Sequence, residues 1–181
     1  MKRYTLFLFF WSILMSNLLA QNSSVLSSGD WYKLATNQNG IYKIEYSDVE
    51  ALGIDVSSLN NSSIKLYGNG RGMLPELNSS FRYTDLVQNS IQIYDLNNNG
   101  FFESGDYILF YGHSPDVWRF NESTGLFEHE INTFTDKVNY FLTIDSQSEG
   151  NRVSQKPILQ EATKVITSFY DFDFHENNFE N

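Results

Sequence analysis

The sequence predicts a mainly β protein: an antiparallel, sandwich-like domain with one or two short helices, preceded by a signal peptide. Aromatic residues make up 16% of the chain, and they fall in short apolar runs separated by clusters of Asn, Gly, Ser and Asp. Such alternation is typical of many short strands joined by turns. An apolar segment at the N-terminus stands apart from this pattern and predicts export.

The first twenty residues predict a secretory signal peptide. Lys2 and Arg3 give a positive start, Leu6–Leu14 is an apolar core, and Ala20 is a small residue at a cleavage position. The apolar run is short for a membrane-spanning helix. Leu18 is large for a site three residues before the cut, which leaves an uncleaved anchor as the alternative. We expect the protein to be exported, to the cell surface, the outer membrane or the periplasm.

Charge and cysteine content exclude several classes of function. Removal of residues 1–20 takes away two positive charges and changes the formal net charge from −10 to −12. An acidic chain repels phosphate backbones, so nucleic acid is not an expected partner, and the membrane is relevant only through export or an outer-membrane complex. The absence of cysteine excludes disulfides, thiolate metal sites and a cysteine nucleophile.

Residues 21–144 are predicted to form one β-rich domain. Trp31–Ala35 and Ile41–Tyr46 flank an Asn-Gly turn and predict a hairpin, and Val117–Phe120 and Leu126–His129 predict a second one. The remaining predicted strands are Ile64–Tyr67, Ile91–Tyr94, Tyr107–Tyr111 and Tyr140–Ile144.

A short helix is predicted after the first hairpin. Ser47 and Glu50 have the spacing of a capping box, and Gly53 offers a stop. Further along, residues 145–156 are polar and predict a loop or linker. Residues 157–181 include an alternating segment, Ser168–Phe174, which predicts a half-buried strand.

The segment from Asp95 to Asp106 has the spacing of a calcium-binding loop. The candidate ligands occupy positions 1, 3, 5, 7, 9 and 12, and Gly100 stands at position 6, where such a loop turns sharply. They are Asp95, Asn97, Asn99, Phe101 through its carbonyl, Glu103 and Asp106. If the loop binds calcium, we expect the ion to be structural.

A plain hairpin loop explains the same residues. The two asparagines lower the charge, an Asp at position 12 is shorter than the usual Glu, and the flanking segments are predicted strands rather than helices. The sequence leaves both interpretations open.

The other motifs give weaker evidence for a functional site. Gly68–Gly72 lacks the spacing of a phosphate-binding loop and is better explained as a turn. The histidines, His113, His129 and His175, have no zinc-binding spacing. Aromatic residues could instead form a platform that binds sugar or peptide, although most aromatics in a β domain are core. The candidates are Trp31, Tyr83, Tyr94, Trp118 and Phe127.

A series of segments in this chain is similar to the N-terminal region of the type IX secretion system sortases (PorU-type) of the Bacteroidota. These enzymes belong to the gingipain-like cysteine peptidase family. The segments are Gly29–Lys33, Gly40–Ile44, Tyr67–Glu76, Asp95–Gly112 and Val138–Leu142. No single motif among them is specific alone.

The resemblance implies a function for a larger protein. Members of the family remove C-terminal sorting signals from secreted cargo at the cell surface and transfer the cargo to anionic lipopolysaccharide. Their catalytic cysteine and histidine belong to a peptidase domain that this chain does not reach, so the chain is expected to be a fragment or an early-terminated product without catalytic residues. Residues 157–181 would lead toward that domain. The expected partners are the peptidase domain of the same protein and type IX secretion components.

A rival interpretation comes from another class of protein: an independent, calcium-stabilised adhesion or carbohydrate-binding β domain. The two interpretations differ in whether a peptidase domain follows in the gene. Composition and spacing alone do not choose between them.

Overall fold

A computed structural model describes residues 24–156 and 166–168. Its elements are η2 (Val25–Ser27), β1 (Trp31–Thr36), β2 (Gly40–Glu45), α2 (Tyr46–Ala51), η3 (Asn61–Ser63), β3 (Ile64–Tyr67), β4 (Gln88–Asn89), β5 (Gln92–Tyr94), β6 (Tyr107–Gly112), β7 (Val117–Asn121), β8 (Leu126–Glu130) and β9 (Val138–Ile144). The predicted signal peptide, and the predicted strand beyond Ser168, lie outside the described residues. Within the described part of the chain, no helix is long and apolar enough to cross a membrane.

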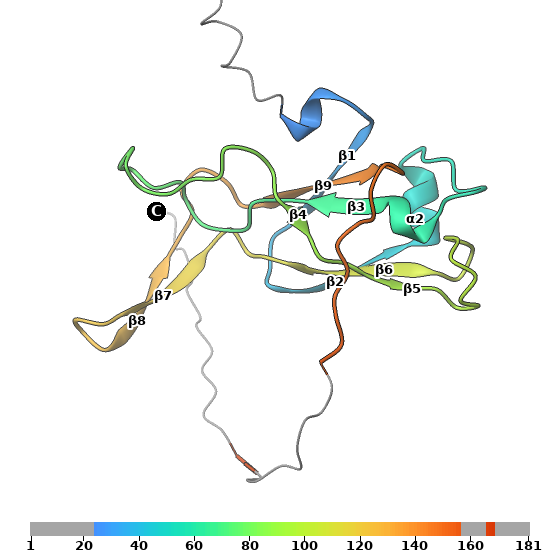
Figure 1. Cartoon of the computed structure of the whole chain (residues 1–181). Coiled ribbons are helices and arrows are strands. Elements are labelled where there is room, and N and C mark those ends of the chain that lie inside the picture. Colours follow the sequence, from blue (N-terminus) through green and yellow to red (C-terminus); the bar gives the residue numbers. More distant parts are fainter. Residues whose placement is uncertain (1–23, 157–165, 169–181) are drawn as a thin grey trace, which may run out of the picture.

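Two antiparallel sheets lie face to face (Figure 1). Sheet A has the strand order β1-β9-β3-β4 and sheet B the order β2-β6-β5, while β7 and β8 form a separate two-stranded ribbon that projects from one end. The prediction of a mainly β, antiparallel, sandwich-like fold with a short helix is confirmed. The strands predicted from the sequence correspond to β3, β5, β6 and β9, and the second predicted hairpin is β7–β8.

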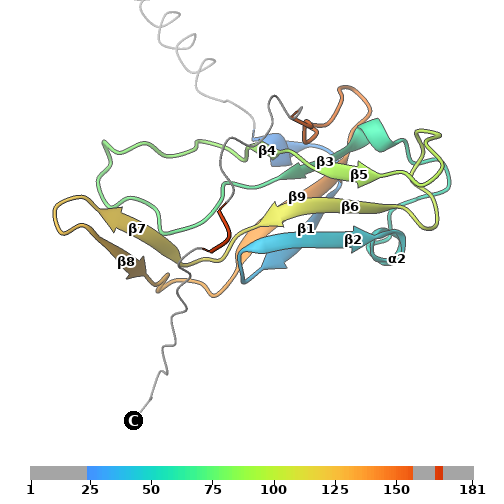
Figure 2. The same ribbon diagram turned by 90° about the horizontal axis from the view of Figure 1, so that it is seen from below.

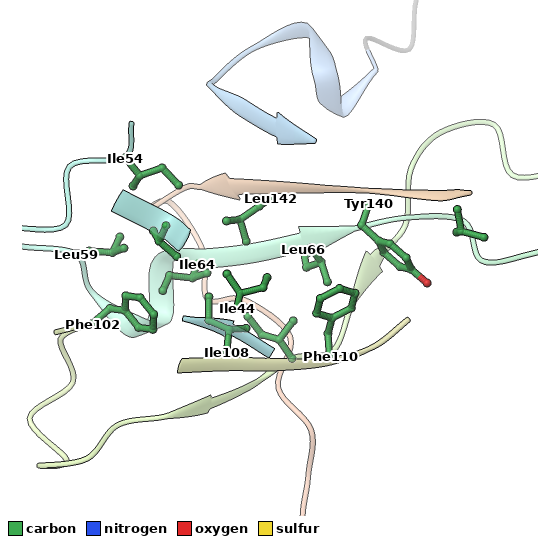
Figure 3. Packing of buried hydrophobic residues seen from close by; sticks show 13 residues of the cluster. Ile44, Ile54, Leu59, Ile64, Leu66, Phe102, Ile108, Phe110, Tyr140 and Leu142 are labelled. Carbon is green, nitrogen blue, oxygen red and sulfur yellow. The ribbon is translucent and has the colours of Figure 1, made fainter. Parts of the chain in front are cut away.

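The core lies between the sheets and follows the period of two residues that a pleated strand imposes. Ile64 and Leu66 of β3, Leu142 of β9 and Ile108 of β6 are fully buried. Their side chains meet in the layer between the sheets (Figure 3). Each such side chain contributes roughly 1.5–3 kcal/mol when it is removed from water.

The predicted hairpin of Trp31–Ala35 with Ile41–Tyr46 is wrong. β1 pairs with β9 and β2 pairs with β6, so the turn between them carries the chain from sheet A to sheet B. Both strands have an apolar face, and stacking the sheets buries both faces at once. Gly112 of β6 shows how close the sheets come, because a Cβ there would lie 2.7 Å from the Thr36 methyl group of β1.

The helix α2 begins two residues earlier than a Ser47 cap requires. Glu45 is the N-cap residue, and the Asp48 carboxylate accepts a hydrogen bond from the Glu45 N–H at 2.8 Å. The predicted Ser47–Glu50 capping box is therefore wrong, because β2 stays extended through Glu45 and fixes where the helix starts. The predicted stop is confirmed: Gly53 has φ +84° and donates to the Glu50 carbonyl.

Residues 145–156 contain no helix or named strand, and they run along the sandwich. Asp145 and Gly150 donate backbone hydrogen bonds to the carbonyls of Ser63 and Ser62. Asp145 also accepts a bond from Lys65, so this segment is tied to sheet A.

Candidate functional site

The loop between β5 and β6 holds all six predicted calcium ligands, and Asp95 organises the first half of this loop. The Asp95 carboxylate accepts hydrogen bonds from the N–H groups of Gly100 at 2.8 Å and Asn99 at 3.3 Å, and from the Asn61 side-chain amide at 2.9 Å. Gly100 has φ +86°, which allows the sharp turn that its position requires.

The two asparagines continue the same pattern. The side-chain oxygen of Asn97 accepts from the Asn99 N–H, and that of Asn99 accepts from the Phe101 N–H. The Asn97 amide donates to Glu103 at 3.0 Å. Each accepting oxygen keeps a second lone pair, so these bonds leave room for a cation at the same atoms.

Asp106 has a different role at the base of the loop. It is buried, and its two carboxylate oxygens accept from the N–H groups of Leu96 and Glu103, at 2.9 and 2.8 Å. These bonds join the two ends of the loop. Among the described residues, no three His, Cys, Asp or Glu side chains gather as a metal-binding group. Calcium binding here would need asparagine and carbonyl oxygens as well as carboxylates, and it stays a prediction.

The remaining sequence motifs are turns and packed side chains. Gly70 and Gly72 both have positive φ angles near +85°, as the turn interpretation requires. Burial, with a smaller contribution from Arg71, lowers the pKa of His113, whose ring packs edge-on against Tyr111. His175 lies outside the described residues.

The five aromatics predicted as a platform occur in several ring pairs. Trp31 contacts Tyr67 edge-on, Tyr83 contacts Phe81, and Tyr94 stacks on Tyr107. On the β7–β8 ribbon, Trp118 stacks on His129 and Phe127 packs against Phe120. Trp118 and Phe127 therefore share one ribbon, while the other three lie on β1, on β5 and in the 71–86 segment.

A patch that the sequence analysis missed covers the outer surface of sheet B, and we term it the tyrosine face. Pairing between strands places its residues in adjacent rows. They are Ile41, Lys43 and Glu45 of β2, Tyr107, Leu109 and Tyr111 of β6, and Gln92 and Tyr94 of β5. Strict alternation in Tyr107-x-Leu109-x-Tyr111 was the available signal, but alternation does not say which of two faces is buried.

Ring geometry orders the tyrosine face. Tyr94 and Tyr107 stack at 4.9 Å with nearly parallel planes, and the Lys43 ammonium lies 4.5 Å from the Tyr107 ring centre. Lys43 also forms a 2.8 Å ion pair with Glu45. The positive and negative charge on this surface therefore compensate each other.

A second exposed apolar region lies at the end of the molecule that carries the ribbon. A groove of about 480 Å³ runs between the segments 72–76 and 132–135, and Met73, Leu74 and Phe134 provide its apolar lining. The 71–86 loop and the ribbon both extend from this end in Figures 1 and 2.

Comparison with known proteins relates the fold to a solved structure. No family model and no curated protein matches the chain. Among solved structures, the fold is similar to that of dimeric latent PorU from Porphyromonas gingivalis, with 25% sequence identity and a TM-score of 0.52. The match covers 74% of this chain and 11% of the PorU chain, so the chain is similar to one part of a much longer protein.

Proposed function

We propose that this chain is a non-catalytic β module of a PorU-type sortase of the type IX secretion system. In this role the module packs against the peptidase domain of the same polypeptide or against a partner of the secretion machinery. The larger protein would remove C-terminal sorting signals from exported cargo.

The likeness to part of PorU is the observation that carries this proposal. It agrees with the resemblance drawn independently from the segments Gly29–Lys33 through Val138–Leu142. The exposed tyrosine face suits a module that is covered by other protein.

The composition supports a role other than catalysis. A peptidase of the gingipain type uses a cysteine nucleophile, and this chain contains no cysteine. The acids of the Asp95–Asp106 loop bond to the loop's own amides, which suits a structural role.

An in-frame deletion of codons 24–156 in the source bacterium tests the proposal. Mass spectrometry of exported type IX cargo should then find the C-terminal sorting signals retained, and the intact gene should restore their removal. Normal cargo termini in a strain that still makes the shortened protein would contradict the proposal.

The rival function predicts a different result in the same strain. An independent carbohydrate-binding domain would leave cargo processing intact, and the purified chain would bind surface polysaccharide. Isothermal titration with polysaccharide from the same bacterium measures that directly.

A further inference from the structure

We propose that the tyrosine face of sheet B is the surface on which another folded domain of the same polypeptide docks. This inference rests on the proposed function, because it takes the chain to be one module of a longer protein. Figure 2 looks onto this side of the molecule, with sheet A behind it.

The face is unusually apolar for an outer sheet surface. Ile41 is 75% exposed, Tyr111 54% and Tyr94 50%, and all three belong to one continuous surface through the pairing of β2, β6 and β5. An antiparallel sheet normally turns its polar residues to water and its apolar residues to the core. Tyrosine is also enriched at the centres of protein interfaces.

Charge defines the kind of surface that fits. The chain has a formal net charge of −10, yet the charges on this face are one lysine and one glutamate that pair with each other. A complementary surface is therefore apolar and without net charge. A strongly basic partner would gain little here.

Area distinguishes a tethered domain from a second copy of the chain. β2 and β6 are six residues long, so with β5 the face measures about 20 Å by about 15 Å, or about 300 Å². Two copies joined through it would bury about 600 Å² in total, roughly half of what a stable interface between separate chains needs. A domain on the same polypeptide binds at a local concentration in the millimolar range, so a contact of this size is enough.

Tyrosine labelling offers a direct test with an internal control. Tyr83 is 53% exposed, matches Tyr94 and Tyr111 in chemistry, and lies in the 71–86 loop, outside the strands of sheet B. The 181-residue chain and the longer product of the native gene are each nitrated with tetranitromethane under native conditions, and each site is read by mass spectrometry.

In the longer protein, labelling of Tyr94 and Tyr111 should fall at least fivefold relative to the 181-residue chain, while Tyr83 changes less than twofold. Equal labelling of the three tyrosines in the longer protein would overturn the docking face. Protection that appears in the short chain and grows with its concentration would assign the face to a second copy, and would also overturn the proposal.

A pair of variants in the longer protein sharpens the result. Ile41→Lys places an unpaired charge on the face and should return Tyr111 to the labelling rate of the short chain. Leu74→Lys, at a side chain 76% exposed in the groove at Met73, should leave Tyr111 protected. If neither variant changes the protection, sheet B is not the contact.

The labelling experiment and the deletion strain can give independent results. Unprotected tyrosines together with defective cargo processing would reject the docking face and leave the proposed function standing. Protected tyrosines with normal cargo processing would reject the sortase function and keep the docking surface.

Discussion

At the scale of single residues, Lys65 and Asp145 form an ion pair that is buried at one end only. The Lys65 side chain is 2% exposed and the Asp145 side chain 40%, and their charged atoms lie 2.5 Å apart. The Lys65 ammonium also donates to the Ser148 hydroxyl. The pair therefore fixes the 145–150 segment to sheet A. It also gives the buried Lys65 ammonium a hydrogen-bond acceptor and a counter-charge in place of water.

Asp145→Asn should lower the free energy of unfolding by about 1–2 kcal/mol at pH 7. This lies below the cost of breaking a fully buried pair, because Asp145 is partly screened by solvent. The Lys65 hydrogen bond, followed by one from the Gln147 N–H, lowers the pKa of Asp145. A lowered carboxylate pKa stabilises the fold above the unfolded value near 4, and that contribution is lost as the pH falls through the folded value.

Urea unfolding at pH 7 and at pH 2 measures this effect. The difference in the free energy of unfolding between wild type and Asp145→Asn should shrink toward pH 2. The control variant Glu122→Gln, at an exposed turn position, should have nearly the wild-type free energy of unfolding at either pH. A difference that is equal at both pH values would show that the ion pair is not its source.

Asp95 is the residue on which the calcium prediction depends. Calcium bound to the native state alone should raise stability by RT ln(1 + [Ca]/Kd), about 2.7 kcal/mol at roughly a hundredfold excess over Kd. Asp95→Ala should abolish this increment, and it should also lower stability without calcium, because three hydrogen bonds to the carboxylate are lost.

The matched control for that experiment follows from backbone geometry. Asn98 is not a predicted ligand, but it has φ +55°, where alanine is strained. Asn98→Gly is therefore the suitable control and should keep the full calcium increment. Thermal unfolding with calcium and with chelator is the measurement, and equal wild-type midpoints in the two conditions would reject the site.

At the scale of elements, substitutions at the N-terminus of α2 show which residue caps the helix that follows β2. Asp48→Ala removes the carboxylate that accepts from the Glu45 N–H and should cost about 1 kcal/mol. Ser47→Ala should be nearly neutral, because Ser47 lies within the helix and is not its cap. Urea titration of both variants decides the matter, and a larger loss for Ser47→Ala would restore the cap predicted from the sequence.

Local sequence patterns predicted which segments form strands better than they predicted which strands pair with each other. β3, β6 and the β7–β8 ribbon follow from alternation and turn residues close to where they occur. The pairing of β1 with β9 joins residues more than a hundred positions apart, and a turn motif carries no information about such contacts. The Asn39-Gly40 turn therefore predicts a hairpin, whereas in the structure it connects two sheets.

At the scale of the whole molecule, the sequence predicted the sandwich and the loop at Asp95–Asp106 but not the surfaces that suit a partner. Alternation in β6 predicts that one face is buried and the other exposed, and only the packed core shows that the face with Tyr107 and Tyr111 is the outer one. Of the five aromatic residues predicted as a platform, Trp118 and Phe127 share the β7–β8 ribbon, and the other three lie on separate elements.

The most direct test of the account is the size of the native protein that carries this module. An antibody against residues 24–156 should detect, in the exported fraction of the source bacterium, a protein several times heavier than the 20.9 kDa of this chain. Peptide mapping of that protein should find a cysteine peptidase domain in the same polypeptide. A single species of 20.9 kDa or less, with no peptides from outside this sequence, would contradict the account.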